Sequence, residues 1–445
     1  MQIDLTRGSV FKNILFFSGP FLLSYFLQTL YGMADLYITG QFNGTASISA
    51  VAIGSQVMHM VTVIIVGLAM GPAVLVGRAV GEKNKEKLSS VTGNSIVLFV
   101  IIAALFTLVL TLCLSPIVAL MKTPQESVQE TQAYLLVCFC GIPLVTAYNV
   151  IASLFRGLGD SKSPLFFIAL ACIFNIALDF LFIGVCNWGA QGAAWATVIS
   201  QAVSVLVSLL YMKKTSGIRL TREDLRLHSQ TVGDMLIIGG PVACQDGFIQ
   251  ISFLLITIIA NGRGLAVATA VGIVEKIITF LFLVPSTMLS CISAIASQCI
   301  GAGQELRARK TLWCGTALAL SAGCLFALIA QFASVQILSL FTDDASVIRL
   351  GAQYFRAYSF DCIAAAVHFS FSGYFCAVGL SLVSFIHNVI SILLVRIPGA
   401  WLSAKWWPQN LYPMGLAAPL GSLLSSLICL GVYAWLLRSK KNALC

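Results

Sequence analysis

The stretch Ile168–Gly184, IALACIFNIALDFLFIG, decides the fold of this chain. Its residues are apolar or small except for Asn175 and Asp179, and a helix places side chains four residues apart on one face. An apolar run of this kind is typical of a membrane-spanning helix. An amide and a carboxylate on one face of such a helix then indicate a polar site between membrane helices.

The whole chain has the composition of an integral membrane protein. Of its 445 residues 58% are hydrophobic and 10% are charged, and its mean hydropathy is +0.94. Continuous apolar runs, without period-two alternation, favour a helical bundle over a barrel, and we expect the first span to be retained as a membrane helix. Apolar stretches of about 20 residues predict twelve spans, near 13–39, 48–77, 91–119, 130–155, 164–186, 189–212, 231–260, 265–300, 311–340, 346–376, 382–403 and 414–437.

The two halves of the chain repeat each other at a spacing near 220 residues, which is common in transporters. Six spans, an even number, separate the copies, so both halves have the same orientation in the membrane. The matching pairs are SGPF at Ser18 with GGPV at Gly239, GRAVGEKNKEK around Gly81 with SQCIGAGQELR around Gly301, and LFRGLGDSK around Gly159 with YFCAVGLSL around Gly379.

This repeat predicts the fold class and the domains. We expect an all-α integral membrane protein whose twelve transmembrane helices form two six-helix lobes related by pseudo-twofold symmetry. The first lobe is predicted at 1–215, a basic cytoplasmic linker at 216–230 and the second lobe at 231–445.

Basic residues predict the orientation. Of the 26 Lys and Arg residues, 19 fall on the side that holds both termini, which the positive-inside rule places in the cytoplasm. Topology and anionic lipid headgroups account for the net charge of +9, and nucleic-acid binding is not expected. We expect a monomer in a cytoplasmic membrane.

Common catalytic and metal-binding motifs do not occur. The 14 cysteines are scattered without a CxxC pair, so we interpret them as small buried hydrophobic residues. Neither HExxH nor GxSxG occurs in a span, so we do not expect an enzyme.

Four polar residues of the first half are expected at one depth. With about 1.5 Å of rise per residue, Asp179 lies about 25 Å beyond Lys162, and Thr197, counted back from Lys213, reaches the same outer half. Asp35, Asn175, Asp179 and Thr197 therefore form a candidate site for a proton or Na⁺, because carboxylate, amide and hydroxyl oxygens suit both. The alternative is a hydrogen-bonded cluster that only joins helices.

The second half also places charged residues in its spans. The candidates for binding a cation or substrate are Asp246, Glu275, Tyr358 and Asp361. Lys276 and Arg356 are expected to neutralise some of these acids, so a purely structural salt-bridge network is the alternative. For His59, His368 and His387 we expect a helix-joining role.

Pro20 interrupts the span that carries Asp35. Because proline removes a backbone donor and permits bending, a bend at Pro20 could move that acid. The alternative is a passive kink.

At these residues the chain resembles the multidrug and toxic compound extrusion (MATE) transporters of the bacterial NorM-like and DinF-like branch, over essentially its full length. The segments that carry the resemblance are GPF…ADLYITG, GRAVGEKN, RGLGDSKSP, FNIALDFLFIG, GAQGAAWATVIS and YSFDCIAAAVHFSFSGYF. The resemblance implies a cation site at Asp35, Asn175, Asp179 and Thr197, and a second-lobe acid and tyrosine at Asp361 and Tyr358. Ile249 stands where NorM-like proteins carry a glutamate, and Asp246, a turn earlier, is its candidate substitute.

The resemblance also implies the function. A MATE-like protein exports amphipathic, often cationic, compounds by antiport against Na⁺ or H⁺, with no cofactor besides the coupling ion. Its expected partners are small organic substrates and membrane lipid. The alternative is a flippase for lipid-linked precursors from the same superfamily, although such proteins usually cluster Arg or Lys in their central cavity. A channel is disfavoured, since no filter-like repeat occurs.

Overall fold

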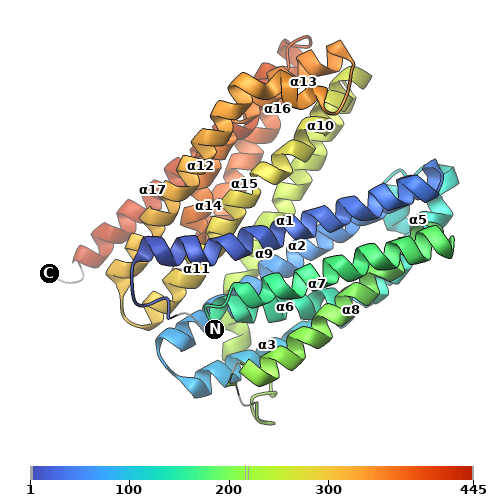
Figure 1. The fold of residues 1–445 in the computed structure, drawn as a ribbon. Coiled ribbons are helices and arrows are strands. Elements are labelled where there is room, and N and C mark those ends of the chain that lie inside the picture. Colours follow the sequence, from blue (N-terminus) through green and yellow to red (C-terminus); the bar gives the residue numbers. More distant parts are fainter. Residues whose placement is uncertain (1–3, 216, 219, 443–445) are drawn as a thin grey trace. The chain divides into compact units, whose positions relative to one another are not determined.

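The computed structural model describes residues 4–215, 217–218 and 220–442, and these contain helices and no strand. The predicted linker 216–230 includes residues 216 and 219, which lie outside the described part. Figure 1 shows the helices in chain order: α1 (Val10–Phe42), α2 (Thr45–Gly81), α3 (Lys85–Leu112), α4 (Leu114–Leu120), α5 (Gln125–Cys140), α6 (Ile142–Gly157), α7 (Lys162–Asp179), η1 (Phe180–Val185), α8 (Gly189–Thr215), α9 (Ser229–Asn261), α10 (Leu265–Leu281), α11 (Leu283–Gly301), α12 (Glu305–Ser339), α13 (Ala345–Tyr358), α14 (Asp361–Val378), α15 (Ser381–Ser391), η2 (Ile392–Arg396), α16 (Ile397–Trp406) and α17 (Tyr412–Asn442).

The helices confirm the predicted spans. Within the described residues, eleven helical stretches are long and apolar enough to cross a membrane, and α5 with α6 makes a twelfth that bends by 48°. The bend falls at Gly141, inside the predicted span 130–155. Two spans contain a π-helical segment, η1 after α7 and η2 after α15.

The internal repeat is visible in the backbone. Gly159 and Gly379, 220 residues apart, both adopt the left-handed conformation, with φ of 84° and 88°. Lys83 and Gly303 are a second such pair, with φ of 55° and 72°. Because left-handed backbone is uncommon outside glycine, its recurrence at one spacing confirms that the two halves share local structure.

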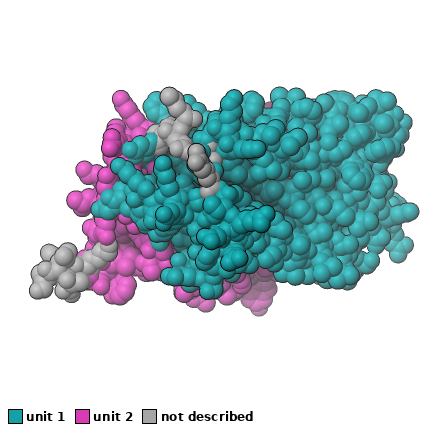
Figure 2. Space-filling view, turned by 90° about the horizontal axis from the view of Figure 1, so that it is seen from below, with its two compact units in different colours: residues 1–5, 16–243, 301–303 teal, residues 6–15, 244–300, 304–445 magenta. Residues whose placement is uncertain are grey.

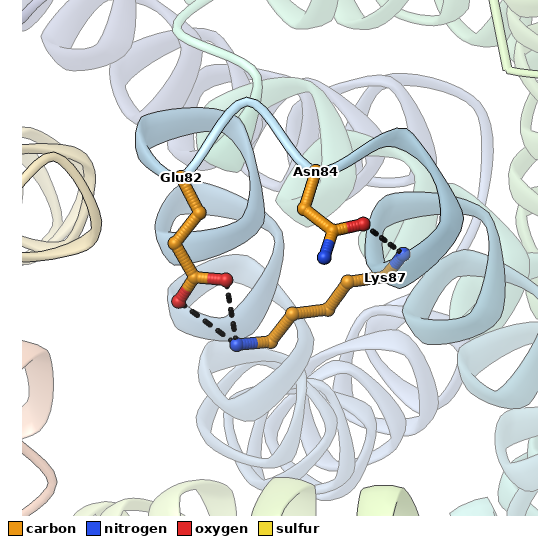
Figure 3. Close-up of polar contacts among 3 residues, drawn as sticks. All are labelled: Glu82, Asn84 and Lys87. Carbon is orange, nitrogen blue, oxygen red and sulfur yellow. Dashed lines mark hydrogen bonds and ion pairs between the residues drawn. The ribbon is translucent and has the colours of Figure 1, made fainter.

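Caps fix two loop-to-helix junctions. Figure 3 shows Asn84, whose Oδ1 accepts a hydrogen bond from the Lys87 amide at 2.9 Å, while Lys87 Nζ lies 2.8 Å from both carboxylate oxygens of Glu82. A side chain that satisfies a free amide favours the start of a helix. Asp344 caps α13 in the same way, and its hydrogen bonds from the hydroxyl and amide of Ser346 hold the pKa of Asp344 below its usual value.

Contacts divide the chain into two compact units, coloured in Figure 2. Unit 1 comprises 1–5, 16–243 and 301–303, and unit 2 comprises 6–15, 244–300 and 304–445. Two long helices therefore belong to both units, since α1 changes unit after Leu15 and α9 after Ala243. Each carries a proline near the change, Pro20 in α1 and Pro241 in α9.

Each unit has its own apolar core. In unit 1 the core includes Ile65, Leu135 and Phe139, which are fully buried. In unit 2 it includes Val274, which is also fully buried. Large apolar side chains remain exposed along the helices, for example Leu112 at 74%, as expected for surfaces that face lipid.

Glycines allow α2 and α9 to pack backbone against backbone in unit 1. A Cβ atom on Gly71 would lie 2.2 Å from the carbonyl oxygen of Met235, and one on Gly239 would lie 2.2 Å from that of Leu68. Small residues at such crossings are typical of membrane helix pairs.

Candidate cation-binding site

Three helices of unit 1 bring the four predicted residues together. Asp35 comes from α1, Asn175 and Asp179 from α7, and Thr197 from α8. Thr197 Oγ1 donates to Asp35 Oδ2 at 3.3 Å, and Asn175 Nδ2 donates to Thr197 Oγ1 at 3.5 Å. The Asp35 and Asp179 carboxyl groups interact directly.

This cluster is deeply buried and rich in unsatisfied acceptors. Asp35, Asn175 and Asp179 are each exposed by 2% or less. Four of their oxygens make no hydrogen bond of good geometry, namely Asp35 Oδ1, Asn175 Oδ1 and both oxygens of Asp179. Buried polar atoms are normally satisfied, so this concentration of acceptors needs a positively charged partner.

The electrostatics lead to the same requirement. Two ionised carboxylates side by side repel each other, and in a membrane span each is costly without an opposite charge. A bound proton or a small cation removes that cost. Carboxylate, amide and hydroxyl oxygens are hard ligands, which fit Na⁺ and do not fit soft transition metals. In line with this, the described residues contain no cluster of three or more His, Cys, Asp or Glu.

A local irregularity directly follows Asp179. It is the last residue of α7, and the chain continues directly into the π-helical segment η1. A π turn contains an extra residue, changes the direction of later side chains and occurs frequently at functional sites. The periodicity of the sequence does not predict this turn.

Two further residues surround the site. Tyr31 lies one turn before Asp35 on α1 and interacts with Gln201, which lies one turn after Thr197 on α8. Sequence reasoning missed both. The signal was available, since a spacing of four on a helix places each on the same face as its site residue.

In unit 2 the structure gathers three of the four predicted residues around an arginine. Arg396 is 7% exposed, donates from Nη2 to Tyr358 Oη and interacts electrostatically with Asp361 and Glu275. Its guanidinium carbon lies 4.7 Å from the centroid of the Phe253 ring. We call Arg396, Tyr358, Asp361 and Glu275 the second-unit charge cluster. Unlike the unit 1 site, this cluster contains a permanent cation, while both carboxylate oxygens of Asp361 make no hydrogen bond of good geometry.

One of the two expected neutralising partners, Arg356, requires a correction. Arg356 does not pair with an acid in the described structure, because its Nε donates to Ser334 Oγ at 2.7 Å. Lys276 is exposed and affects Glu275 less than Arg396 does. The sequence analysis missed Arg396, although an arginine inside the apolar run SILLVRIPG is itself unusual.

Asp246 lies apart from this cluster. It interacts with Cys376 at the end of α14, and no charged partner faces it among the described residues. His368 and His387 form a separate buried pair with ring centroids 5.7 Å apart. His387 Nε2 lies 3.0 Å from Ser372 Oγ and so links α15 to α14.

Comparison with known proteins shows the family of the chain. The sequence profile of the MatE family matches residues 20–181 and 241–402, one segment in each half. The probable multidrug resistance protein YpnP of Bacillus subtilis is 27% identical over 423 residues, which cover 95% of this chain and 94% of the relative. The multidrug export protein MepA of Staphylococcus saprophyticus is 21% identical over 375 residues, which cover 84% and 83%.

Solved structures show the same fold. An outward-facing multidrug resistance MATE transporter of the MOP superfamily superposes with a TM-score of 0.92, with 20% identity and 99% of each chain covered. A mutant of the Vibrio cholerae MATE transporter VcmN superposes with a TM-score of 0.90, with 20% identity and 97% of each chain covered.

Proposed function

We propose that this chain, which belongs to the MatE family of multidrug efflux transporters, is an antiporter that exports amphipathic, often cationic, organic compounds in exchange for Na⁺ or H⁺. We place it in the bacterial cytoplasmic membrane with both termini in the cytoplasm. The basic residues of the loops on the side of the termini support this orientation.

One observation carries the coupling proposal. Four buried acceptor oxygens without hydrogen bonds come from Asp35, Asn175 and Asp179 and lie at one place in unit 1. The Thr197 hydroxyl completes the set. A single bound cation satisfies these acceptors and the charge of the paired carboxylates at once.

Cation binding can drive export by shifting populations. If the site opens to the outside, the inward electrochemical gradient loads it with a cation. A cation that binds one conformation more tightly favours that conformation, and a drug that prefers the other conformation is then released. The energy available is limited to the difference between the affinities of each ligand for the two states.

The second-unit charge cluster has a different proposed role. Arg396 already supplies a positive charge to Asp361 and Glu275, so we propose that coupling ions bind in unit 1. Asp246, which lies apart and without an opposite charge, is the better candidate in unit 2 for contact with a cationic substrate.

Flux measurements test the coupling. The purified protein in liposomes should export a fluorescent cationic dye when a Na⁺ or a pH gradient is imposed separately. Asp35→Asn and Asp179→Asn should each lower this flux by about tenfold or more, because a lost charge-assisted interaction is worth about 1.5–3 kcal/mol and 1.4 kcal/mol is tenfold. Asp343→Asn, the same change at an exposed acid, is the control. Near-normal flux in both buried variants would contradict the proposal.

A further inference from the structure

One face of α1 is polar through most of unit 1. Ser24, Gln28, Tyr31 and Asp35 follow at spacings of four, three and four, which places them in one line along the helix. The line starts near Pro20, whose carbonyl oxygen accepts a hydrogen bond from Ser24 at 2.8 Å. It ends at the candidate cation site.

A small cavity opens beside the cytoplasmic part of this line. Its wall is formed by α1, α2, α6 and α7, all within unit 1, and the residues that matter below are Phe21, Tyr25, Gln28, Tyr148, Asn149 and Arg156. About 20 Å³ is open to the centre of a water molecule. That is room for a group of one or two heavy atoms more than a single water, not for a whole drug.

Arg156 gives this cavity a positive charge that no acid balances. The guanidinium carbon lies 5.1 Å from the centroid of the Phe21 ring, and the charge interacts with the Tyr25 and Tyr148 side chains. Within the described structure Arg156 makes neither a hydrogen bond nor an ion pair, and no Asp or Glu lines the cavity. Cation–π contact with a ring satisfies none of its five N–H donors.

Such an arrangement fits an oxyanion. The planar donor fork of a guanidinium matches a carboxylate. The aromatic side chains around it suit the flat apolar part next to such a group. The amides of Gln28 and Asn149 add polar groups that orient it.

We propose that the Arg156 cavity is a substrate subsite, which binds the carboxylate group of an amphipathic aromatic compound while the rest of the molecule lies outside it. The proposal rests on the export function proposed above and assigns to Arg156 the recognition of a carboxylate on the substrate.

The polar line also connects the subsite to the coupling site. Tyr148 interacts with both Arg156 and Gln28, and Tyr31 interacts with Tyr148, Gln201 and Asp35. An oxyanion at Arg156 and a cation at Asp35 would thus act on the same hydrogen-bonded side chains of α1. Contiguous networks of this kind are one physical route for coupling between sites.

A matched pair of dyes tests the subsite. A rhodamine with a free benzoate carboxylate and its methyl ester share the cationic ring system and differ in the oxyanion alone. In Arg156→Gln, transport of the acid should fall about tenfold or more relative to the ester, as expected for the loss of a charged hydrogen bond. Arg156→Lys, which keeps the charge, should retain part of the discrimination. Lys162→Gln is the control. It removes an exposed charge at the start of α7, two residues before Pro164 of the cavity wall, and should leave the acid-to-ester ratio unchanged.

Direct binding separates this proposal from the export function. Fluorescence anisotropy of each dye with the purified protein should show weaker binding of the acid, and unchanged binding of the ester, in Arg156→Gln. This difference in binding does not depend on whether an ion gradient drives flux. If transport fails but the protein still binds the acid and the ester differently, the result counts against the export function alone. Equal losses for acid and ester, in binding and flux, would overturn the subsite. The subsite would also be overturned if native mass spectra showed that Arg156→Gln loses a co-purified anionic phospholipid while the ratio of acid to ester transport stays unchanged. Arg156 would then bind lipid and not substrate.

Discussion

Replacement of Arg396 by glutamine tests the contrast between the two units. The variant keeps a side chain of similar length but removes the cation that faces Asp361 and Glu275. The second-unit charge cluster then holds two buried acids without an opposite charge. A buried acid that loses the nearby positive charge becomes costly, so we expect a fall in the melting temperature of the purified protein.

A second substitution separates charge from packing. Asp361→Asn removes one of the two uncompensated acids, so the double variant Arg396→Gln/Asp361→Asn should be more stable than Arg396→Gln alone. The interaction energy from the double-mutant cycle should be about 1–3 kcal/mol. Arg356→Gln is the matched control, because Arg356 binds a serine hydroxyl and no acid; it should show no such interaction with Asp361→Asn.

The same variant should acquire a response to cations. The parent for this test is the double variant Asp35→Asn/Asp179→Asn, in which the unit 1 site should no longer bind a cation. This parent should melt at the same temperature with and without Na⁺. Adding Arg396→Gln should make melting depend on Na⁺ or on acid pH, because ligands that bind the folded state stabilise it. A variant as stable as its parent, with no cation response, would refute the view that Arg396 acts as a built-in cation.

Three further predictions concern the bend in α1, the contact between α2 and α9, and the orientation in the membrane. Pro20→Ala restores a backbone donor in α1 and should slow export while leaving cation binding intact; unchanged export would favour a passive kink. Gly239→Ala places a Cβ atom 2.2 Å from a backbone oxygen of α2 and should destabilise the protein by about 1–3 kcal/mol, whereas a melting curve like that of Gly240→Ala, whose Cβ meets nothing within 4 Å, would contradict this. Single cysteines in 82–87 should react with membrane-impermeant reagents from the cytoplasm alone, and those in 405–410 from outside alone, and the reverse pattern would overturn the proposed orientation.

The unit 1 cluster was predictable because its members are separated by known helical geometry. A constant rise per residue placed Asp179 and Thr197 at one depth, and the structure joins both to Asp35. The spans were predictable for a related reason, since bilayer thickness fixes the length of an apolar helix. The resemblance to a family supported the same residues independently of depth.

Local breaks in the helices were not predictable. Gly141 bends a span by 48°, and η1 and η2 lie within continuous apolar runs. A continuous apolar run occurs in both α-helical and π-helical turns, so the hydrophobic pattern does not show where a π turn will form. Arg396 itself is visible in the sequence, but the helices that it faces depend on its position at the end of η2, which the pattern does not predict.

The limits of the compact units were also not predictable from composition. The basic segment after α8 indicates a linker, whereas contacts group residues 16–243 together, including the first half of α9. The reason is visible at Gly71 and Gly239, where α9 packs backbone against backbone on α2. A linker marks where the chain is polar, and it does not determine where a long helix finds its packing partners. The boundaries at 215 and 231 therefore stay predictions.

The repeat allows equivalent positions of the two halves, which share local structure, to be compared for charge. At a spacing of 220 residues, Arg396 corresponds to Ile176, the neighbour of Asn175, in the span that carries a π-helical segment in both halves. In unit 1 that span ends its α-helical part with Asp179, whose carboxylate oxygens make no hydrogen bond of good geometry, and in unit 2 it carries a cation. A charge fixed to the chain cannot exchange with solution, so under the proposed function we expect an ion gradient to act on unit 1 and not on the second-unit charge cluster. A duplicated pair of equivalent ion sites would load two ions in each cycle; a protein in which one copy supplies its own cation should load them from one half alone.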